Sequence, residues 1–230
     1  MEVVLINHTP EPLRTIYTAA RTCYAAGTPA SMWKASVSEE AMAALIRKTI
    51  GSGHFSVAEH VTFVFAISGI SRACSHQLVR HRIASFSQQS QRYVALKQQP
   101  EFVMPVSIEK NEQARLIFTE LMKSSTSAYL QLVELGIAAE DARSVLANAC
   151  PTNLVMTMNL RELIHASSVR LCIRAQREIR TLFDKIAVEV KRVEPLIGQY
   201  LVPKCESLGF CDEDASLSCG LYPTFEEARK

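Results

Sequence analysis

The sequence has no run of about 18 or more consecutive apolar residues, the length that an α-helix needs to cross a membrane. Its first residues, MEVVLINHTPEPLR, also lack the basic start, the apolar middle and the small-residue cleavage site of a secretory signal. Charge of one sign is not in excess either, because 25 Lys and Arg nearly balance 23 Asp and Glu and leave a formal net charge of +2. We therefore expect a cytoplasmic protein without a membrane partner, whose surface as a whole does not attract polyanions.

The cysteines do not indicate a disulfide framework. Seven of them, an odd number, are scattered through the chain at positions 23, 74, 150, 172, 205, 211 and 219. The tail cysteines 205, 211 and 219 contain no C-x-x-C pair, so a zinc knuckle there is not favoured. Cys23 has no histidine base adjacent in sequence, which favours a buried thiol over a nucleophile. We expect reduced thiols.

Hydrophobic periodicity predicts an α+β fold with a small mixed or antiparallel sheet packed by long helices. Runs rich in β-branched and aromatic side chains predict strands at residues 2–8, 60–68 and 152–158. Apolar residues at helical spacing predict helices over residues 11–25, 41–53, 70–82, 107–136, 138–149, 160–174 and 175–200. We expect residues 1–230 to form a single domain, in which residues 204–230 are a C-terminal tail of unassigned role.

Local signals refine these boundaries. Ser36 with Glu39 gives a capping pattern before the helix over 41–53, and Asn159 with Glu162 gives another before the helix over 160–174. The stretch FSQQSQ that follows residue 85 has neither helical nor strand periodicity. It predicts an ordered loop that leads into a short strand at residues 92–96, RYVAL.

Arginines are concentrated around the stretch RHRIASFSQQSQRYV, residues 80–94. The planar guanidinium of arginine gives phosphate two parallel charge-assisted hydrogen bonds and stays ionised at physiological pH. The stretch and its flanks combine arginines with serine donors and with glutamines that suit the edge of a base, namely Arg72, Arg80, Arg82, Arg92, Ser85, Ser87, Ser90, Gln77, Gln88, Gln89 and Gln91. This mixture favours a nucleotide, although composition alone leaves a solvated basic loop open.

A second cluster lies within the helix predicted over residues 160–174. Arg161 and His165 are one helical turn apart on one face, whereas Arg170 falls on roughly the opposite side. One helix can therefore serve two ligands, with Asn159 and Arg174 at its ends. The alternatives are an ion pair for Arg161 and a histidine whose hydrogen bonds are satisfied within the fold for His165.

Two other readings of the sequence are weaker. His54, Glu59 and His60 lie close together, but they cross a predicted loop and strand start and have no further obvious ligand, so we predict no metal site. Gly51 and Gly53 follow a helix rather than a strand, which excludes a dinucleotide-binding fingerprint.

Beyond composition, the sequence resembles the flavin-dependent thymidylate synthases. The resemblance rests first on Arg80-His81-Arg82, seven residues, and then Ser90-x-Arg92, which is similar to a long and specific signature of that family. It continues in the segments GHFSVAEH (53–60), SHQLVRHR (75–82), AR (142–143) and MNLRELIHASSVRL (158–171), in the same order, over roughly residues 50–180.

The resemblance implies reductive methylation of dUMP to dTMP, with 5,10-methylenetetrahydrofolate as carbon donor, FAD as hydride carrier and NADPH as reductant. It also implies a homotetramer whose active sites lie between subunits. Positions that match FAD-binding ones are Ser56, Arg80, His81, Arg82, Gln88, Asn159, Leu160, Arg161 and His165, with His54 near the flavin. Positions that match dUMP-binding ones are Gln77, Leu78, Val79, Arg80, Gln88, Gln89, Ser90, Gln91, Arg92, Arg143 and Arg170, with residues 88–92 given by another subunit.

Within that resemblance we assign the catalytic role to Arg170. Uracil C5 becomes nucleophilic when the ring carries negative charge, and a fixed guanidinium beside N3 and the carbonyl oxygens favours that form. Ser90 is interpreted as a nucleotide ligand rather than an attacking group. One departure concerns Gln88 and Ser87, where the family often has Glu and Asn. Gln88 can form hydrogen bonds but carries no charge, so its role follows least directly from the resemblance.

Two alternatives stay open at this point. A nucleic-acid-binding module would use the basic stretch with Phe86 and Tyr93 as stacking groups, but the near-neutral charge and 7% aromatic content do not favour it. A flavin-binding protein without synthase activity would retain the FAD-binding residues, but its nucleotide loop would not function because of Gln88.

Overall fold

An antiparallel sheet of four strands organises the fold in the computed structural model, which describes residues 1–229. The strands are β1 (Glu2–His8), β2 (Thr62–Ser71), β3 (Ala84–Gln88) and β4 (Pro151–Asn159), in the spatial order β1-β2-β4-β3. Every neighbouring pair is antiparallel. The α+β class predicted from the sequence is therefore confirmed, and the sheet is antiparallel rather than mixed.

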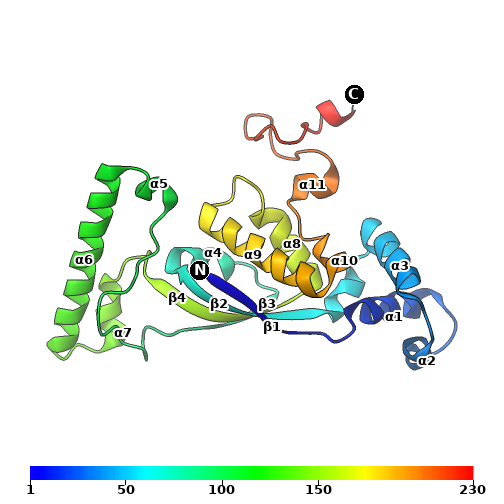
Figure 1. Ribbon diagram of the computed structural model, residues 1–230, viewed down its shortest axis with the longest axis horizontal. Helices are drawn as coiled ribbons and strands as arrows, with labels where there is room; N and C mark the ends of the chain where they lie inside the picture. Colours follow the sequence, from blue (N-terminus) through cyan, green and yellow to red (C-terminus); the bar gives the residue numbers. More distant parts are fainter. Residues whose placement is uncertain (230) are drawn as a thin grey trace.

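Three helices cover one face of this sheet (Figure 1). They are α4 (Arg72–Leu78), α8 (Leu160–Arg170) and α9 (Arg177–Val193). Alternate strand residues point toward them, because successive side chains of a strand face opposite sides. Phe63, Phe65 and Met156 are fully buried in this layer, where they join a hydrophobic core that also includes Phe183 of α9.

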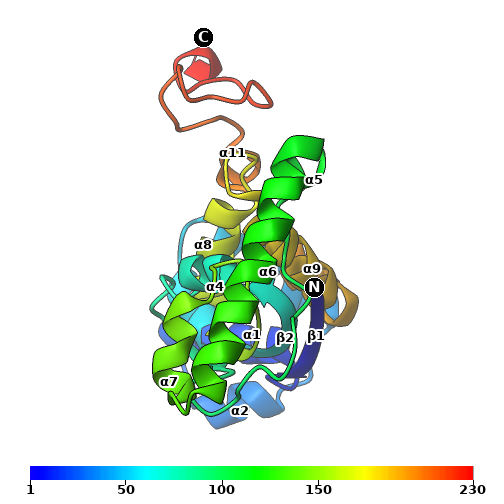
Figure 2. The ribbon, with the colours of Figure 1, turned by 90° about the vertical axis from the view of Figure 1, so that its left-hand side faces the viewer.

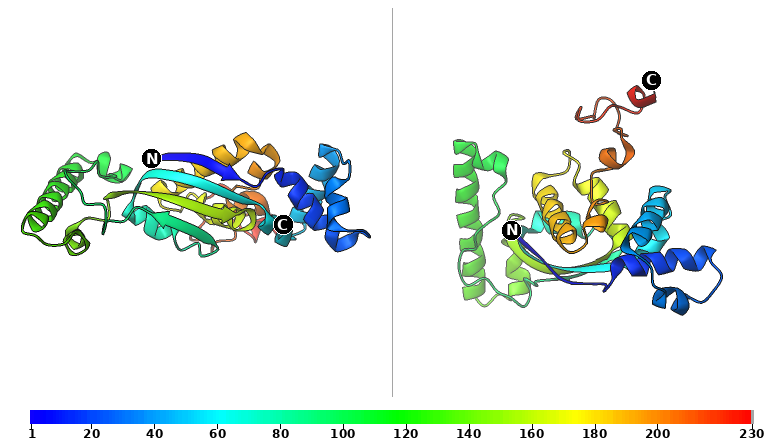
Figure 3. Two further views of the ribbon diagram at one scale, coloured as in Figure 1. Left: turned by 90° about the horizontal axis from the view of Figure 1, so that it is seen from below. Right: turned by 45° about the vertical axis from the view of Figure 1, so that its right-hand side comes forward.

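The opposite face of the sheet is bare within the chain, as the view from below shows (Figure 3, left). Val4 and Ile6 of β1 and Val155 of β4 lie on this face and expose 42%, 53% and 39% of their surface. Apolar side chains in a row on an open sheet are typical of a surface that another subunit covers.

Helices extend the molecule at both ends of the sheet (Figures 1 and 3). One end carries α1 (Pro12–Tyr24), α2 (Pro29–Lys34) and α3 (Glu39–Gly51), followed by the 3₁₀-helix η1 (Phe55–His60). The other end carries α5 (Val106–Glu109), the long α6 (Glu112–Glu134), α7 (Ala139–Ala142) and the 3₁₀-helix η2 (Arg143–Val145).

The chain finishes in short elements. Helix α10 (Pro195–Gly198) packs against α9, and α11 (Lys204–Leu208) precedes a segment that extends away from the sheet to the 3₁₀-helix η3 (Glu227–Arg229), as Figure 2 shows. The expected tail over residues 204–230 includes Lys230, which lies outside the described residues. Within the part of the chain that the structure describes, no helix has the length and apolar character that a membrane crossing requires.

Several predicted elements are confirmed with local causes. The predicted strand over residues 2–8 coincides with β1, and the strand predicted over 152–158 is β4 with one further residue at each end. Helix α8 begins where the capping pattern placed it, because the side-chain oxygen of Asn159 accepts the backbone N–H of Glu162 at 2.9 Å.

Other predicted boundaries are wrong. The strand expected at residues 92–96 does not form, because the chain pairs earlier, as β3, where residues of alternating burial match β4 in register. The N-cap of α3 is Ser38 rather than Ser36, and its hydroxyl accepts the N–H of Ala41 at 3.2 Å. The helix expected over 107–136 is divided at Asn111, whose side chain caps the start of α6.

The remaining helices are shorter than predicted. Ile70 belongs to β2, so that α4 starts only at Arg72, and α8 ends at Arg170 rather than residue 174. The helix expected over 175–200 consists of α9 and α10, separated at Glu194 before Pro195. A proline starts the second helix because its fixed φ suits a first turn while its ring would disrupt a continuing one.

The contact between α10 and α9 provides a test of the fold at Gly198. A Cβ added there would lie 2.7 Å from the Cα and Cβ of Lys191, closer than two carbons can approach. We expect Gly198→Ala to lower the free energy of unfolding by about 1–3 kcal/mol, because the helices must separate. Gly51→Ala is the matched control, since nothing lies within 4 Å of its added Cβ. It should leave stability unchanged or raise it by up to about 1 kcal/mol; urea denaturation of both variants measures the difference, and equal stabilities would contradict this packing.

Candidate active site

A buried histidine joins the end of α4 to both ends of α8. His81 is 7% exposed and lies three residues after α4. Its Nδ1 lies 3.2 Å from Oε1 of Glu162, in the first turn of α8, and its Nε2 lies 3.0 Å from Nε of Arg170, at the last residue of α8. The guanidinium of Arg170 can only donate, so Nε2 accepts and the proton on the imidazole resides on Nδ1, where it is donated to Glu162.

Electrostatics favour the neutral form of this imidazole. The pKa of His81 is lowered from 6.5 to about 4, mainly because burial disfavours the charged ring and also because Arg170 and His165 are nearby. Burial likewise raises the pKa of the Glu162 carboxyl and lowers that of Arg170. A neutral imidazole therefore separates the carboxyl from the guanidinium.

The guanidinium of Arg170 is fixed on a second side. Its NH2 group donates to the backbone carbonyl of Gln77 at 3.2 Å. Two hydrogen bonds from elements that are separate in sequence restrict the rotamers of this long side chain, which is only partly exposed. Its position is thus determined by the fold before any ligand binds.

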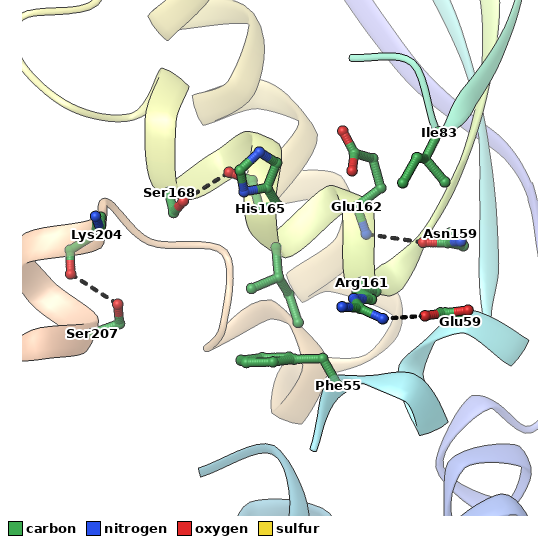
Figure 4. Close-up of a pocket in the computed structure, with 11 residues that line it drawn as sticks. Phe55, Glu59, Ile83, Asn159, Arg161, Glu162, His165, Ser168, Lys204 and Ser207 are labelled. Atoms are coloured by element: carbon green, nitrogen blue, oxygen red, sulfur yellow. Dashed lines mark hydrogen bonds and ion pairs between the residues drawn. The ribbon is translucent and has the colours of Figure 1, made fainter. Parts of the chain in front are cut away.

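Next to this buried network lies a cavity of about 630 Å³ (Figure 4). It is lined by Phe55, Glu59, Ile83, Asn159, Arg161, Glu162, Ile164, His165, Ser168, Lys204 and Ser207. They come from η1, the loop before β3, the end of β4, one side of α8 from its first to its last turn, and α11. Its volume lies within the range of about 300–1,000 Å³ that small-molecule sites occupy.

Arg161 and His165 line this cavity from one face of α8, as their spacing predicts. Arg161 forms an exposed ion pair with Glu59 on one wall of the cavity, which Figure 4 marks. The alternative role for Arg161, an ion pair with an acidic residue, is therefore also confirmed in the chain without a ligand. Exposed pairs of this kind contribute little to stability, about 0–1 kcal/mol, so an anionic ligand can replace the glutamate.

The lining suits a flavin. Phe55, Ile83 and Ile164 offer apolar surface to a flat ring system, while Arg161 supplies the positive charge that phosphate or a reduced ring requires. Glu59 and Glu162 add acid to the same wall, but burial raises the pKa of Glu162 and Glu59 already faces Arg161. The residues present are compatible with FAD on these grounds.

A metal ion at the same place is disfavoured. The ligand atoms of His81, Glu162 and His165 lie within 4.8 Å of one another. However, one nitrogen of His81 already accepts from Arg170, whose positive charge opposes a cation. In the part of the chain that the structure describes, His54, Glu59 and His60 form no group with ligand atoms this close.

The predicted nucleotide residues 88–92 lie at the far end of β4 from this cavity. Gln88 pairs with Leu154 and the loop continues beyond it, whereas the cavity residue Asn159 ends the same strand. Five residues of strand separate these two β4 positions by roughly 17 Å, and the loop leads farther away. One chain therefore does not bring residues 89–92 to its own cavity.

Arg92 and Arg143 instead meet at α7. Arg92 forms an exposed ion pair with the carboxylate of Glu140, and Nε of Arg143 donates to the backbone carbonyl of the same residue at 3.0 Å. Two of the four arginines predicted to bind the nucleotide are thus neighbours. Ser90 is next to them, and its hydroxyl accepts the backbone N–H of Arg92 at 3.1 Å.

The glutamines of this segment bond within the fold. Nε2 of Gln88 donates to the hydroxyls of Ser75 at 3.0 Å and Thr152 at 3.1 Å. Gln89 accepts from Asn153 at 3.0 Å. Gln91 lies 3.5 Å from the sulfur of Cys150. The amide of Gln88 therefore faces the interior, where a neutral side chain meets two neutral hydroxyls.

The other predicted residues divide by exposure. Those exposed to solvent are His54, Ser56, Val79, Arg80 and Arg82. Leu78 and Leu160 are fully buried, so only their backbone groups remain for a ligand. His81 has both ring nitrogens occupied, and it belongs to the network that orients Arg170 rather than to the lining of the cavity.

Sequence reasoning missed some residues of the cavity. Glu162 was assigned to the helix cap, and nothing in the local pattern shows that its side chain turns inward to His81. Phe55 and Glu59 lie within the matched segment GHFSVAEH, which was the available signal. Lys204 and Ser207 belong to the tail, outside the resemblance, and no sequence signal placed them near α8.

Comparisons with known proteins agree with this geometry. A family model described as "Thymidylate synthase complementing protein" matches residues 4–196. The flavin-dependent thymidylate synthase of Nitratidesulfovibrio vulgaris is 45% identical over 233 residues, which cover 96% of this chain and 95% of that protein.

Two solved structures share the fold. One is a UMP/dUMP methylase from Streptomyces cacaoi bound with 5-Br dUMP, with a TM-score of 0.75, 23% sequence identity and coverage of 86% of this chain and 93% of that one. The other is the flavin-dependent thymidylate synthase of Helicobacter pylori complexed with FAD and dUMP, with a TM-score of 0.70, 22% identity and coverage of 88% and 100%.

The buried imidazole predicts a pH dependence of stability. Because its pKa is about 4 in the folded protein and the ordinary value for histidine is 6.5, His81 takes up a proton on unfolding at any pH between these values. The contribution of His81 to the free energy of unfolding is complete above pH 6.5. It is lost as the pH falls toward 4, with a slope of at most about 1.4 kcal/mol per pH unit.

We expect the free energy of unfolding to fall less steeply with decreasing pH in His81→Gln than in the wild type. Urea denaturation at several pH values between 4 and 7 measures the slopes. His76→Gln is the control, because His76 lies exposed on the same helix α4. A slope in His81→Gln equal to that of the wild type would show that the imidazole is not held neutral.

Proposed function

Because the chain belongs to the flavin-dependent thymidylate synthase family, we propose that it methylates dUMP to dTMP reductively. FAD carries the hydride, 5,10-methylenetetrahydrofolate donates the carbon and NADPH is the reductant. The observation that carries this proposal is the cavity bearing Arg161 and His165 beside a guanidinium, that of Arg170, which the fold has already oriented.

FAD is proposed to occupy the cavity and its exposed rim. Asn159, Arg161 and His165 line the cavity. The exposed Arg80 and Arg82 lie just before the cavity residue Ile83 in the chain. These cations would meet the pyrophosphate or the negative charge of the reduced ring, whose hydride chemistry belongs to the cofactor. Ser56 and His54 stand exposed near Phe55, where folate and NADPH would approach the flavin.

Arg170 is proposed as the group that activates the uracil ring. A guanidinium held by His81 and Gln77 would stabilise negative charge on N3 and the carbonyl oxygens, which makes C5 nucleophilic without a cysteine. Cys74 lies near Arg170, but burial raises its pKa to about 12, so it stays a thiol. Gln77, Leu78 and Val79 would present backbone groups to the same ligand.

A homotetramer is proposed because a single chain separates the two halves of the site. Arg92, Arg143 and Ser90 lie beyond one end of β4, and the cavity lies at the other. A second chain would supply residues 88–92 and hold the dUMP phosphate next to the flavin of the first. Leu116, Ile117 and Leu121 expose 63%, 64% and 60% of their surface along α6, which supports subunit contacts there.

The same proposal treats the chain as one domain in the cytoplasm. Its support is a continuous core that joins Leu13 of α1 to Leu201 after α10. Nucleic-acid binding is not favoured, because Phe86 packs against the core instead of standing free to stack on a base. Tyr93 is exposed, but Arg92 lies 5.3 Å from its ring centroid.

The uracil role of Arg170 is tested by Arg170→Ala. We expect the variant to retain the flavin spectrum and to lose turnover by about 10²- to 10³-fold, because removal of one electrostatic group at the reacting atoms has that effect. Arg177→Ala, an exposed arginine at the start of α9, is the control and should turn over normally. Normal turnover by Arg170→Ala would contradict the assignment, and loss of flavin would indicate a structural role.

The reaction as a whole is tested by anaerobic visible absorption of the purified protein. The flavin band should bleach when NADPH is added and return only when dUMP and methylenetetrahydrofolate are both present. Return without dTMP formation would favour a flavin-binding protein that lacks synthase activity. A protein that stays colourless after incubation with FAD would refute the flavoenzyme proposal.

A further inference from the structure

Four of the seven cysteines line one cavity of about 170 Å³ at the C-terminal end of α8. Cys172 follows α8, and Cys205, Cys211 and Cys219 come from the C-terminal segment, residues 204–229. Cys211 is buried, Cys172 and Cys205 are partly buried, and Cys219 is exposed. These positions are far apart in sequence and line one cavity because the start of the C-terminal segment lies beside the end of α8.

The C-terminal segment has no hydrophobic core of its own. Among residues 204–229 the one buried residue is Cys211. Exposed ion pairs, Lys204 with Asp212 and Arg174 with Glu213, join it to itself and to the end of α8. Such pairs contribute about 0–1 kcal/mol each, which does not offset the entropy of ordering a segment of this length. Segments without a core are usually held by disulfides or a structural metal.

Two glycines turn the backbone of the C-terminal segment. Gly209 ends α11 with a φ of 76°, and Gly220 follows Cys219 with the same φ, a conformation in which other residues are strained. Between them the backbone N–H of Cys211 donates to the carbonyl of Pro223 at 2.7 Å. The three cysteines of the segment line the same cavity as Cys172.

We propose that Cys172, Cys205, Cys211 and Cys219 bind one zinc ion in a tetrahedral site that fastens the C-terminal segment to α8. Zinc prefers four thiolates at about 2.3 Å, which places the sulfur atoms about 3.8 Å apart. Among the residues that the structure describes, the cysteine sulfurs do not form a group of three within 4.8 Å. Metal binding must therefore draw the walls of this cavity together.

Charged side chains also line the cavity. Arg174 and Lys204 lie there with their ion-pair partners Glu213 and Asp212, so these four groups add no net charge to the charge of about −2 of four thiolates and one zinc ion. Zinc binds cysteine as the thiolate, so occupation of the site would release protons.

Zinc binding also has a consequence for the flavin cavity, which rests on the proposed function. Lys204 and Ser168 line both cavities, and Ser207 of α11 lines the larger one. A metal that holds α11 in place would complete that wall. The zinc site itself is inferred from the cysteines alone, so its test does not depend on turnover.

The proposal is tested by the metal content of the full-length protein, purified without a polyhistidine tag under reducing conditions. Inductively coupled plasma mass spectrometry should find about one zinc per chain. Serine variants at each of the four positions should lose most of that zinc. Cys23→Ser should keep it, because Cys23 lies on α1, where it is exposed and not buried as the sequence predicted. Full retention of zinc by any of the four variants would overturn the tetrathiolate assignment.

A second measurement uses the wild type alone, in case a serine variant fails to fold. Co²⁺ should replace the zinc and give the intense near-ultraviolet charge-transfer bands of thiolate ligation together with tetrahedral d–d bands. A wild-type protein that holds no zinc after growth in zinc-supplemented medium and gives no such bands with Co²⁺ would refute the proposal.

Discussion

The two hydrogen bonds of the buried His81 imidazole are the constraint on which the site depends. One nitrogen binds Glu162 and the other binds Arg170, so the ring ties the segment after α4 to both ends of α8. Helix α8 is also fixed at its start, where the N–H of Leu160 donates to the carbonyl of Val61 at 2.7 Å. These contacts fix both ends of α8, the helix that carries Arg161, His165 and Arg170.

The neutral ring also determines how much charge Arg170 offers. A carboxylate in direct contact with the guanidinium would neutralise it, and a ligand would then have to compete with an ion pair. Here the imidazole stands between Glu162 and Arg170, and burial keeps it uncharged. The positive charge is therefore fixed in place without a matching anion, as a group that stabilises an anionic ring requires.

Sequence reasoning predicted the elements whose causes are local, such as β1 from its β-branched residues and the start of α8 from Asn159. It failed at β3, because ASFSQ has polar side chains on its open face and takes its register from β4, which is distant in sequence. The resemblance supplied the site residues, but the inward turn of Glu162 and the gathering of four cysteines depend on tertiary packing. Local patterns carry no signal for either.

The separation of Arg92 and Arg143 from the cavity gives a reason for the bare face of the sheet. Residues 89–92 and the cavity are held apart by β4, and no rotation of side chains spans a strand. The proposed site needs both, so under this proposal another copy of the chain would complete it and would have to be held in one orientation. The apolar Val4, Ile6 and Val155 on the open face provide the kind of contact that fixes such an orientation. In the proposed assembly their exposure in one chain would follow from the catalytic geometry, because the surface that binds the partner would also position half of its site.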